Sequence, residues 1–563
     1  MEISRIGILC DDTNLQQWKF RSIKRITDEG IGELSAVILN GGPVNGAKKT
    51  KWYSSLDGIR NGIFHRYRKT FVTIPSERIV NIGKEFPRAD VLTCKYEKKG
   101  KYSQYFQEKD LERIRSFELD VLLRFGFGII KGGILDSASY GVWSFHHDDE
   151  TIYRGGPPCY WEIYRKDPVT GAVLQRLTER LDGGIILKKG YFKTIDHSYG
   201  SALEQSLSES SNWPYEVLRD IRNGVVDPGR IEPSRTTAPI YRIPSLLNLA
   251  LFTSKMAGAR LRNYVLEFRR EKWNIGIISD KSTGIMDGLE ERKVKWFEEK
   301  KGRGDFYADP ILLSTEKWGT HVLFEDYDHG AKRADISSVE IKDGRPPENV
   351  EKTKSKLVMD EMHRSYPFVF NDGKDIYLTP ECYEDGEISL YKLENLKSKP
   401  VHVRTVVRNF EGVDPTIVQH NGRWWLFCTS HSEGSSLKLY IFHSRELSGS
   451  WEPHAMNPVK CDIRSSRPAG PFFREKGRFY RPAQNCSGTY GGSITINRVD
   501  ELSTKKFVEI PVREIGPLKP YAKGIHTISR AGSIVVLDGK RYEWSPLFFL
   551  EKLREKTQSN RKK

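Results

Sequence analysis

A dipeptide that ends in proline recurs along the second half of the chain, and it constrains the fold more than any other feature. Four copies begin at Asp309, Tyr366, Asp414 and Gly470, each ahead of a short apolar run, and a fifth such run follows His526. The steps between these anchors are 57, 48, 56 and 56 residues, a spacing typical of propeller blades. A turn and a second strand-like run follow each anchor, and proline is tolerated at the first residue of a strand. We therefore predict an all-β, five-bladed β-propeller.

The first part of the chain has a different texture, in which strand-like and helix-like segments alternate. Residues 6–10 and 35–39 are apolar runs of strand length, and a helix-like segment separates them. Residues 119–125 are nearly all apolar, as a buried parallel strand should be. This alternation predicts an α/β domain with a Rossmann-like, doubly wound sheet.

We expect a multidomain chain with four segments. The α/β domain is assigned residues 1–243, a helical linker 244–272, the propeller 273–550 and a basic tail 551–563. The linker is either an ordinary packed helix or a basic amphipathic helix in peripheral contact with a membrane surface.

Charge and cysteine content narrow the possible functions. The net charge of +16 favours anionic partners such as folate polyglutamate, nucleotide-sugar phosphates or an acidic membrane face. No helix-turn-helix, zinc-finger or RRM signature is present, so we expect no nucleic acid partner. The seven cysteines include no C-x-x-C pair, so neither a disulfide framework nor a metal site is expected. A signal-peptide pattern and an apolar run of about 20 residues are both missing, which predicts a soluble, cytoplasmic protein.

Six short elements follow one another between residues 119 and 184 in an informative order. They are an apolar strand, a turn with an apolar segment, a strand that ends in histidine, an Arg-Gly turn, a strand that opens with Thr-Gly, and an Asp-Gly-Gly loop. The corresponding residues are 119–125, 128–135, 141–146, 154–156, 170–177 and 182–184. This order resembles the formyltransferase family that acts with 10-formyltetrahydrofolate. The resemblance implies a one-carbon transferase with 10-formyltetrahydrofolate as formyl donor and an amine as acceptor.

Formyl transfer to an amine needs a donor to the developing oxyanion and a route for the proton. By resemblance, His146 carries the proton. Asp182 orients this histidine or a catalytic water and favours the cationic form of the ring, since a nearby carboxylate raises the pKa of a histidine. Ser144 stands where the family has an asparagine that donates to the oxyanion, and its hydroxyl can still donate one hydrogen bond. Residues 147–149 replace the family's proline-serine. They assist the reaction, serve a different one, or form a solvated loop.

The resemblance also implies where folate and acceptor bind. Residues of two segments would line the folate slot, namely Phe125, Phe127, Ile129, Ile130, Leu181 and Gly183. Arg154 and Gly155 would form a tight turn beside the acceptor pocket, and a positive φ would explain the glycine. No G-x-G-x-x-G follows the first strand, so a dinucleotide site is not supported.

The propeller anchors carry the second set of candidate residues. The first strand of each blade lines the central funnel, so the anchors should converge near its axis. The candidates for binding substrate are Asp309, Glu325, Tyr366, Glu381, Asp414, Arg467 and His526. This half resembles five-bladed glycoside hydrolases and the propeller domain of glucosamine inositolphosphorylceramide transferases. Carboxylates that face each other across a sugar suit glycoside hydrolysis; glycan binding and structural capping of turns are the alternatives.

The sequence therefore predicts a formyltransferase-like enzyme that acts on the amine of a sugar, including a nucleotide-linked sugar, while the propeller binds carbohydrate. The alternative is a propeller glycosidase, a glycosyl-transfer component or a glycan-binding module with a degenerate formyltransferase-like scaffold.

Overall fold

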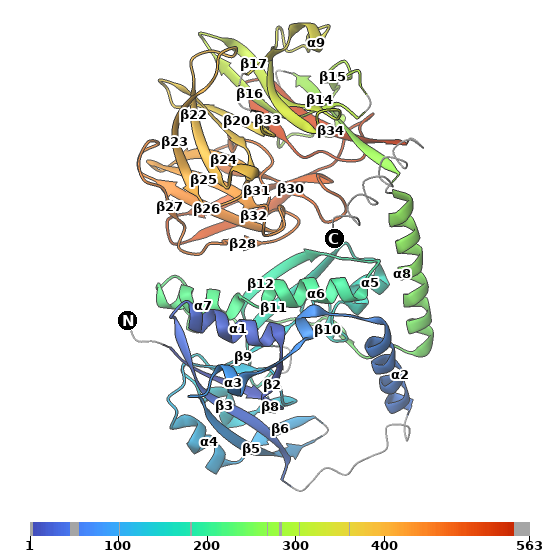
Figure 1. Cartoon of the computed structure of the whole chain (residues 1–563), viewed down its shortest axis with the longest axis vertical. Helices are drawn as coiled ribbons and strands as arrows, with labels where there is room; N and C mark the ends of the chain where they lie inside the picture. The colour runs from blue at the N-terminus through green and yellow to red at the C-terminus, as the bar shows by residue number, and fades with distance from the viewer. Residues whose placement is uncertain are drawn as a thin grey trace. The chain divides into compact units, whose positions relative to one another are not determined.

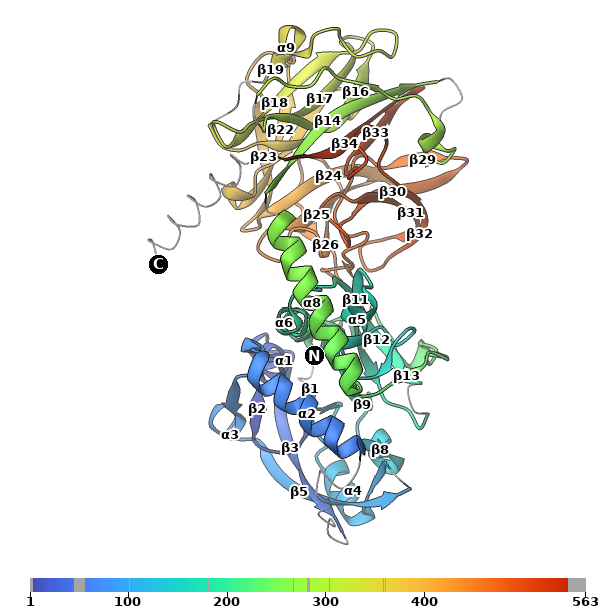
Figure 2. The same cartoon turned by 90° about the vertical axis from the view of Figure 1, so that its right-hand side faces the viewer.

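The computed structural model describes residues 4–44, 56–100, 102–180, 183–266, 268–280, 284–302, 304–357, 359 and 361–544. The chain divides into two compact units, Met1–Leu261 and Arg262–Lys563. Figures 1 and 2 show an α/β unit and a propeller unit, which confirms the predicted fold class.

Nine strands of the described N-terminal unit form one mixed sheet in the order β12-β11-β9-β7-β1-β3-β5-β6-β8. Their bounds are β1 (Ser4–Cys10), β3 (Gly32–Pro43), β5 (Asp90–Lys99), β6 (Ser103–Phe106), β7 (Val121–Arg124), β8 (Ile129–Lys131), β9 (Val142–His146), β11 (Val169–Arg176) and β12 (Ile185–Lys193). Strands β5, β3, β1, β7 and β9 run parallel, whereas β11 and β12 continue the sheet in antiparallel fashion. The parallel centre has the buried, apolar strands that such a sheet requires.

Helices surround this sheet (Figure 1). They are α1 (Gln17–Asp28), α2 (Leu56–Phe71), α3 (Ile82–Glu85), α4 (Glu108–Arg115), α5 (Tyr160–Arg165), α6 (Tyr199–Ser210), α7 (Trp213–Arg222) and α8 (Leu246–Leu266). Helix α4 buries Leu111 and Ile114 in one apolar cluster, and α1 buries Trp18 in another. Two short ladders complete the unit, β2 (Asn14–Gln16) with β4 (Ile79–Asn81) and β10 (Arg154–Gly155) with β13 (Ile240–Tyr241).

Helix α8 occupies the predicted linker. Its Phe252 is fully buried and stacks on Tyr160 with ring centroids 4.2 Å apart. Its Leu247 and Leu261 are exposed. In the described part of the chain, no helix is both long and apolar enough to cross a membrane. The helix is therefore anchored in the α/β unit by aromatic packing, and contact with a membrane surface stays a prediction.

Five sheets form the propeller. Four of these sheets are built from strands that are continuous in sequence. The first consists of β16 (Phe306–Thr315), β17 (Gly319–Asp328), β18 (Arg333–Glu340) and β19 (Ser355–Lys356), and the second of β20 (Ser365–Asn371), β21 (Ile376–Glu381), β22 (Glu387–Leu393) and β23 (Val401–Arg408). The third consists of β24 (Gly412–His420), β25 (Arg423–Ser430), β26 (Lys438–Ser444), β27 (Glu452–Pro453) and β28 (Lys460–Cys461), and the fourth of β29 (Phe473–Glu475), β30 (Arg478–Asn485), β31 (Ser493–Leu502) and β32 (Phe507–Ile515). Helix α9 (Val350–Thr353) lies before β19.

The fifth blade closes the ring with strands from both ends of the domain. It combines β33 (Ile528–Ala531) and β34 (Ile534–Trp544) with β14 (Arg269–Ser279) and β15 (Lys295–Trp296). Strands β14 and β34 pair along their whole length, from Arg269 opposite Trp544 to Ser279 opposite Ile534. This pairing places the first and last long strands of the domain in one blade and so closes the ring of blades.

The anchor residues share a local conformation that the repeat alone does not specify. Asp309, Tyr366, Asp414 and Gly470 have φ angles of 51°, 42°, 49° and 112°. The first three lie at register shifts between the first two strands of their blades. Such bulges redirect a side chain and are common next to functional sites. At Gly470 a Cβ atom would lie 2.0 Å from the carbonyl oxygen of Ile528, so only glycine fits there.

Candidate active site

A cavity of about 430 Å³ opens beside the ends of β7 and β9 in the α/β unit. Loops at the carboxyl ends of parallel strands are the usual ligand-binding edge of such a sheet. Five predicted site residues line this cavity, namely Ile129, Ile130, Ser144, His146 and Gly155. Sequence reasoning did not single out the other polar groups of the wall, which are Arg124, Lys131, Gln175, Thr178, Glu179 and Arg180.

Ser144 is held in place by Arg124, the last residue of β7. Its Oγ accepts hydrogen bonds from Nε and Nη2 of Arg124 at 3.2 and 3.0 Å. A third guanidinium nitrogen donates to the carbonyl oxygen of Gly128 at 3.0 Å. The hydroxyl of Ser144 donates to the carbonyl oxygen of Phe145 over a long distance of 3.5 Å, a weak contact that a ligand oxygen can replace. Burial lowers the pKa of Arg124, yet a guanidinium stays protonated at neutral pH, so a positive charge lies behind the serine.

His146 is the last residue of β9, and its side chain is 19% exposed. Its Nε2 lies 2.9 Å from the carbonyl oxygen of Tyr153. A carbonyl only accepts, so the neutral imidazole carries its proton on Nε2 and leaves Nδ1 as the acceptor. No described residue forms a hydrogen bond with Nδ1. This nitrogen is therefore the basic atom that the cavity offers.

The three residues after His146 are buried, so the solvated-loop alternative is wrong. His147 stacks on Phe145 with centroids 5.7 Å apart, and its Nε2 lies 3.2 Å from Oγ of Ser210. Burial lowers the pKa of His147 to about 3, which keeps the ring neutral. Asp149 accepts from Lys189 at 2.7 Å, and this interaction holds its pKa below the ordinary value against the opposite effect of burial.

Asp148 belongs to a buried carboxyl pair with Glu162 of α5. Its Oδ1 accepts the backbone N–H of Cys159 at 2.7 Å, and its Oδ2 lies 4.0 Å from Nε2 of His146. Both oxygens of Glu162 are buried and accept no hydrogen bond from a described residue. Burial raises the pKa of both groups, that of Glu162 to about 7. Two such carboxyls cannot both ionise easily, so the pair holds a proton near His146.

The structure places the remaining predicted residues of this unit as follows. Phe125 and Phe127 pack in apolar clusters and do not line the cavity. Gly183 donates to the carbonyl oxygen of Arg180, next to the lining residue Gly184. Arg154 also lies outside the cavity wall and donates to the carbonyl oxygen of Ala238 at 2.5 Å. Leu181 and Asp182 lie outside the described residues.

The cavity fits a flat ring system such as that of a folate. Ile129, Ile130 and Leu177 provide apolar walls. Two glycines, Gly128 and Gly184, bring backbone to the edge, and a Cβ atom on Gly184 would lie 2.3 Å from Oε1 of Gln175. Apolar walls with a few placed polar groups are typical of cofactor sites. These residues would hold the pterin of a formyl donor.

The propeller brings most of its predicted residues together around Asp414. Arg467 donates to both carboxylate oxygens of Asp414, at 2.6 and 3.1 Å. Gln484 donates to the same carboxylate at 2.7 Å. Glu381 accepts the backbone N–H of Asp414 at 2.8 Å and lies 3.8 Å from Arg467. Tyr366 accepts the backbone N–H of Gly470 at 2.8 Å. Every group here is paired within the domain.

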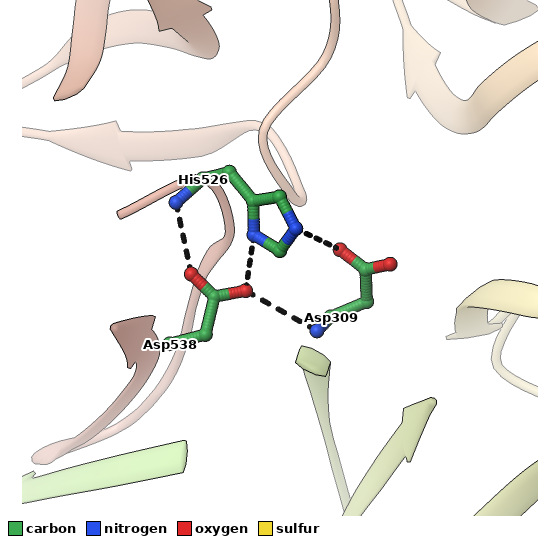
Figure 3. Close-up of side chains that lie close together, drawn as sticks. All are labelled: Asp309, His526 and Asp538. Atoms are coloured by element: carbon green, nitrogen blue, oxygen red, sulfur yellow. Dashed lines mark hydrogen bonds and ion pairs between the residues drawn. The ribbon is translucent and has the colours of Figure 1, made fainter. Parts of the chain in front are cut away.

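His526 lies between two carboxylates, as Figure 3 shows. Its Nδ1 forms an ion pair with Asp538, and its Nε2 lies 3.6 Å from Asp309. Burial alone would lower the pKa of His526, but Asp538 and Asp309 outweigh it and the pKa is raised. Asp538 also accepts the backbone N–H groups of His526, Thr527 and Asp309. The oxygens of Asp538 are thus already used, so the cluster is an internal ion network rather than an open metal site.

Glu325 differs from its neighbours. It is 8% exposed, and its side chain forms no hydrogen bond or ion pair with any described residue. Burial, then the negative charges of Asp309 and Glu381, raise its pKa well above the ordinary value. The carboxyl group of Glu325 therefore favours its protonated form more strongly than a glutamate in water does.

Sequence reasoning missed several residues of these networks, among them Arg124, Glu162 and Asp538. Arg124 ends an apolar parallel strand, and a charged residue at that position is a usable signal for a site at the sheet edge. Glu162 and Asp538 carry no such signal. They reach their partners through folding over 14 and 229 residues, respectively, and no local pattern specifies that pairing.

The fold and the site define a formyltransferase-like α/β domain followed by a five-bladed propeller. Residues 297–527 match the family model described as glucosamine inositolphosphorylceramide transferase 1, N-terminal. The protein of that name from Oryza sativa subsp. japonica is 33% identical over 162 residues, which are 28% of this chain and 22% of the relative. The chain thus matches about a fifth of the length of that plant relative.

Two further comparisons concern formyl transfer. A methionyl-tRNA formyltransferase from Agathobacter rectalis is 28% identical over 120 residues, which are 21% of this chain and 39% of the relative. Among solved structures, glycinamide ribonucleotide transformylase 1 from Symbiobacterium toebii has 15% identity and a TM-score of 0.28, covering 41% of this chain and 94% of that one.

Proposed function

We propose that the α/β unit transfers a formyl group from 10-formyltetrahydrofolate to the amine of a sugar-containing acceptor. The observation that carries this proposal is the convergence of Ser144, His146 and Arg124 in one cavity that has apolar walls for a flat donor. Similarity to methionyl-tRNA formyltransferase supports the reaction class. The cytoplasmic location stays a prediction.

Bound 10-formyltetrahydrofolate supplies an activated formyl group. The amine nitrogen of the acceptor bonds to the formyl carbon, and the bond from that carbon to the donor nitrogen breaks. Nδ1 of His146 takes the proton that the amine loses and returns it to the departing nitrogen. Ser144 donates to the oxygen on which negative charge develops, and Arg124 orients the serine and adds its positive charge. Each group acts from a position that the sheet edge fixes.

The buried pair Asp148 and Glu162 supports this role of His146. Oδ2 of Asp148 lies 4.0 Å from Nε2 of His146, so it faces the positive charge that forms on the ring during the transfer, and the proton held by the pair avoids an excess of negative charge beside the ring. Of the three residues that replace the family's proline-serine, Asp148 is therefore the one that assists the same reaction.

The propeller is proposed to bind the carbohydrate part of the acceptor. A plant protein whose name includes glucosamine and inositolphosphorylceramide shares part of this sequence, and its family model covers most of the propeller. Glu325, whose carboxyl group has no side-chain partner among the described residues, is the group of this cluster that can exchange hydrogen bonds with a sugar hydroxyl or amine.

Binding and turnover with separate variants test the proposal. The wild-type protein should bind 5-formyltetrahydrofolate in a calorimetric titration, and His146→Gln should still bind it while formylation of glucosamine-containing acceptors falls by about 10²–10⁴-fold. The control is His197→Gln, a half-exposed histidine of the same unit, which should change neither quantity. No folate binding by the wild-type protein would rule the proposal out.

A glycosidase is a second candidate because Glu325 is a buried carboxyl group without a side-chain partner among the described residues, and burial and the charge of Asp309 raise its pKa as a general acid requires. Release of sugar from a glucosamine-containing glycan that is lost in Glu325→Gln and kept in His146→Gln would favour it. Absence of any release by the wild-type protein would eliminate it.

A further inference from the structure

A second groove of the α/β unit has the chemistry of an anion site. It encloses about 750 Å³ and is formed by α2, the turn at Gly156, and the segment that follows β13. We call it the Arg242 groove; its polar and aromatic lining includes Arg60, His65, Arg68, Tyr102, Tyr241 and Arg242. Among the described residues that line the groove there is no aspartate or glutamate.

Helix α2 is built to present this charge. Arg60, Phe64 and Arg68 follow one another at intervals of four residues, so they lie on one face of the helix. Phe64 is 4% exposed and anchors that face in the apolar core. The arginines on either side of it are thereby directed along the groove.

The positive charge of the groove is only partly neutralised. Arg68 forms an ion pair with Glu77. The side chain of Arg242 forms no hydrogen bond or ion pair with any residue that the structure describes, and the same holds for the side chain of His65, whose ring lies 6.5 Å from that of Phe64. An exposed guanidinium with its donors unused matches a phosphate group, which it binds through two parallel hydrogen bonds.

The groove adjoins the proposed formyl-transfer cavity. Gly155 and Ile240 line the cavity, whereas their immediate neighbours Gly156 and Tyr241 line the groove. Neighbouring Cα atoms are about 3.8 Å apart. The two spaces are therefore separated by the narrow ladder of β10 and β13, in which Gly155 has a φ of 89° and a Cβ atom would lie 2.2 Å from the carbonyl oxygen of Tyr241. A side chain at Gly155 would force this ladder apart.

We propose that the Arg242 groove binds a phosphoryl group carried by the acceptor, so that the substrate is a phosphate-bearing amino sugar whose amine reaches the cavity beside His146. This inference rests on the proposed formyl transfer for the identity of the ligand. The phosphoryl group comes from a nucleoside diphosphate or from a lipid headgroup. The tyrosines of the groove, Tyr102 and Tyr241, offer ring faces to whatever is joined to the phosphate.

Binding assays on the full chain test the groove without turnover. Inorganic pyrophosphate, uridine diphosphate and phosphatidylcholine vesicles that contain phosphatidylinositol 4-phosphate are the probes. Arg242→Gln should weaken binding of the effective probe about tenfold or more, and His65→Gln should weaken it less. The matched control is Arg230→Gln, whose side chain is 87% exposed in the same unit, and it should leave binding unchanged.

The pattern of binding across the probes and variants tests the proposal and identifies the source of the phosphoryl group. Binding of uridine diphosphate that depends on Arg242 supports a nucleotide-linked acceptor, and dependence seen only with vesicles assigns the phosphate to a lipid. Failure of all three probes to bind, or equal weakening by the two arginine variants, overturns the proposal. A titration with 5-formyltetrahydrofolate separates the two hypotheses. If the phosphate probes bind as expected and the folate does not bind, the result supports phosphoryl binding in the Arg242 groove and contradicts the proposed formyl transfer.

Discussion

Asp414 at the propeller axis accepts three side-chain hydrogen bonds from Arg467 and Gln484, whereas His146 in the α/β cavity has a ring nitrogen that no described residue occupies. Both sites combine acids and bases from distant parts of the chain. At the axis they satisfy one another, with Glu325 as the exception. In the cavity, Nδ1 of His146 has no hydrogen-bond partner among the described residues, and the hydroxyl proton of Ser144 has only a long contact to the carbonyl oxygen of Phe145.

This difference separates two uses of buried charge. A network that is complete in itself fixes a geometry, and its removal is felt as lost stability. A group left with unused hydrogen-bonding capacity at the edge of a cavity is placed for a ligand. We therefore expect axial substitutions to act mainly on folding and cavity substitutions mainly on turnover.

The largest expected effect comes from breaking the axial network. Arg467→Met removes the partner of Asp414 and the nearest cation to Glu381. An uncompensated buried charge costs about 3–5 kcal/mol, so the unfolding transition of the propeller should move to a clearly lower temperature in calorimetry. Arg498→Met is the control because its pair with Asp500 is partly exposed, and such pairs contribute about 0–1 kcal/mol. Equal shifts in the two variants would contradict the distinction.

Substitutions in the cavity should lower turnover and change stability little, the opposite of the axial substitutions. Ser144→Ala removes the proposed donor to the oxyanion, and loss of one such donor lowers kcat by about 10²–10³-fold. The unfolding temperature should change little by comparison. Ser137→Ala is the matched control, since this buried serine donates to the carbonyl oxygen of Gly133 away from the cavity. A Ser144→Ala enzyme with normal kcat would remove Ser144 from the mechanism.

The sequence predicts the fold well because repeats and strand patterns are local. The spacing of the proline anchors depends only on neighbouring residues of each blade, and the apolar run 119–125 identifies β7. The closure of the ring is not local. Strands β14 and β34 pair although more than 250 residues separate them in the sequence, and no local pattern in either strand predicts which strand it pairs with.

In the candidate active site, too, the residues that belong to a local motif could be predicted from the sequence, and the long-range contacts could not. Ser144, His146 and Gly155 line the cavity as members of an ordered motif. The bond between Arg124 and Ser144 depends on the parallel register of β7 and β9, where these two residues are partners. The pairing of Asp148 with Glu162 depends on a left-handed turn at Cys159, which has a φ of 58° and begins α5. The spacing of residues in the sequence does not predict such tertiary contacts.

The buried pair provides a test that lies between the two regions, because it is enclosed like the axial network but lies beside the cavity. The pKa of Glu162 is raised from its ordinary value of 4.5 to about 7, so the folded state holds this proton more tightly than the unfolded state. The free energy of unfolding of the α/β unit should therefore fall as pH rises from about 4.5 to 7 and then level off. Glu162→Gln, which mimics the protonated acid, should lack this fall and gain up to roughly 3 kcal/mol at pH 8.

Denaturant unfolding at several pH values measures this dependence. Glu112→Gln is the control, since Glu112 is an exposed residue of α4, and it should follow the wild-type curve. A wild-type curve that is flat between pH 4.5 and 7, together with no gain in Glu162→Gln, would show that the pair is not a proton-holding unit.

The smallest effect should come from trimming the axial network without removing a charge. Thr527 donates its hydroxyl to Oδ1 of Asp309 at 2.7 Å, and Asp309 keeps His526 as a neighbour when that hydroxyl is lost. Thr527→Val should therefore cost only about 1.5 kcal/mol of propeller stability, as expected for one hydrogen bond to a charged group. Thr527→Ser retains the hydroxyl and should recover most of the loss in thermal unfolding. A loss as large as that of Arg467→Met would mean that the hydrogen bonds, rather than the opposite charges, hold the axis together.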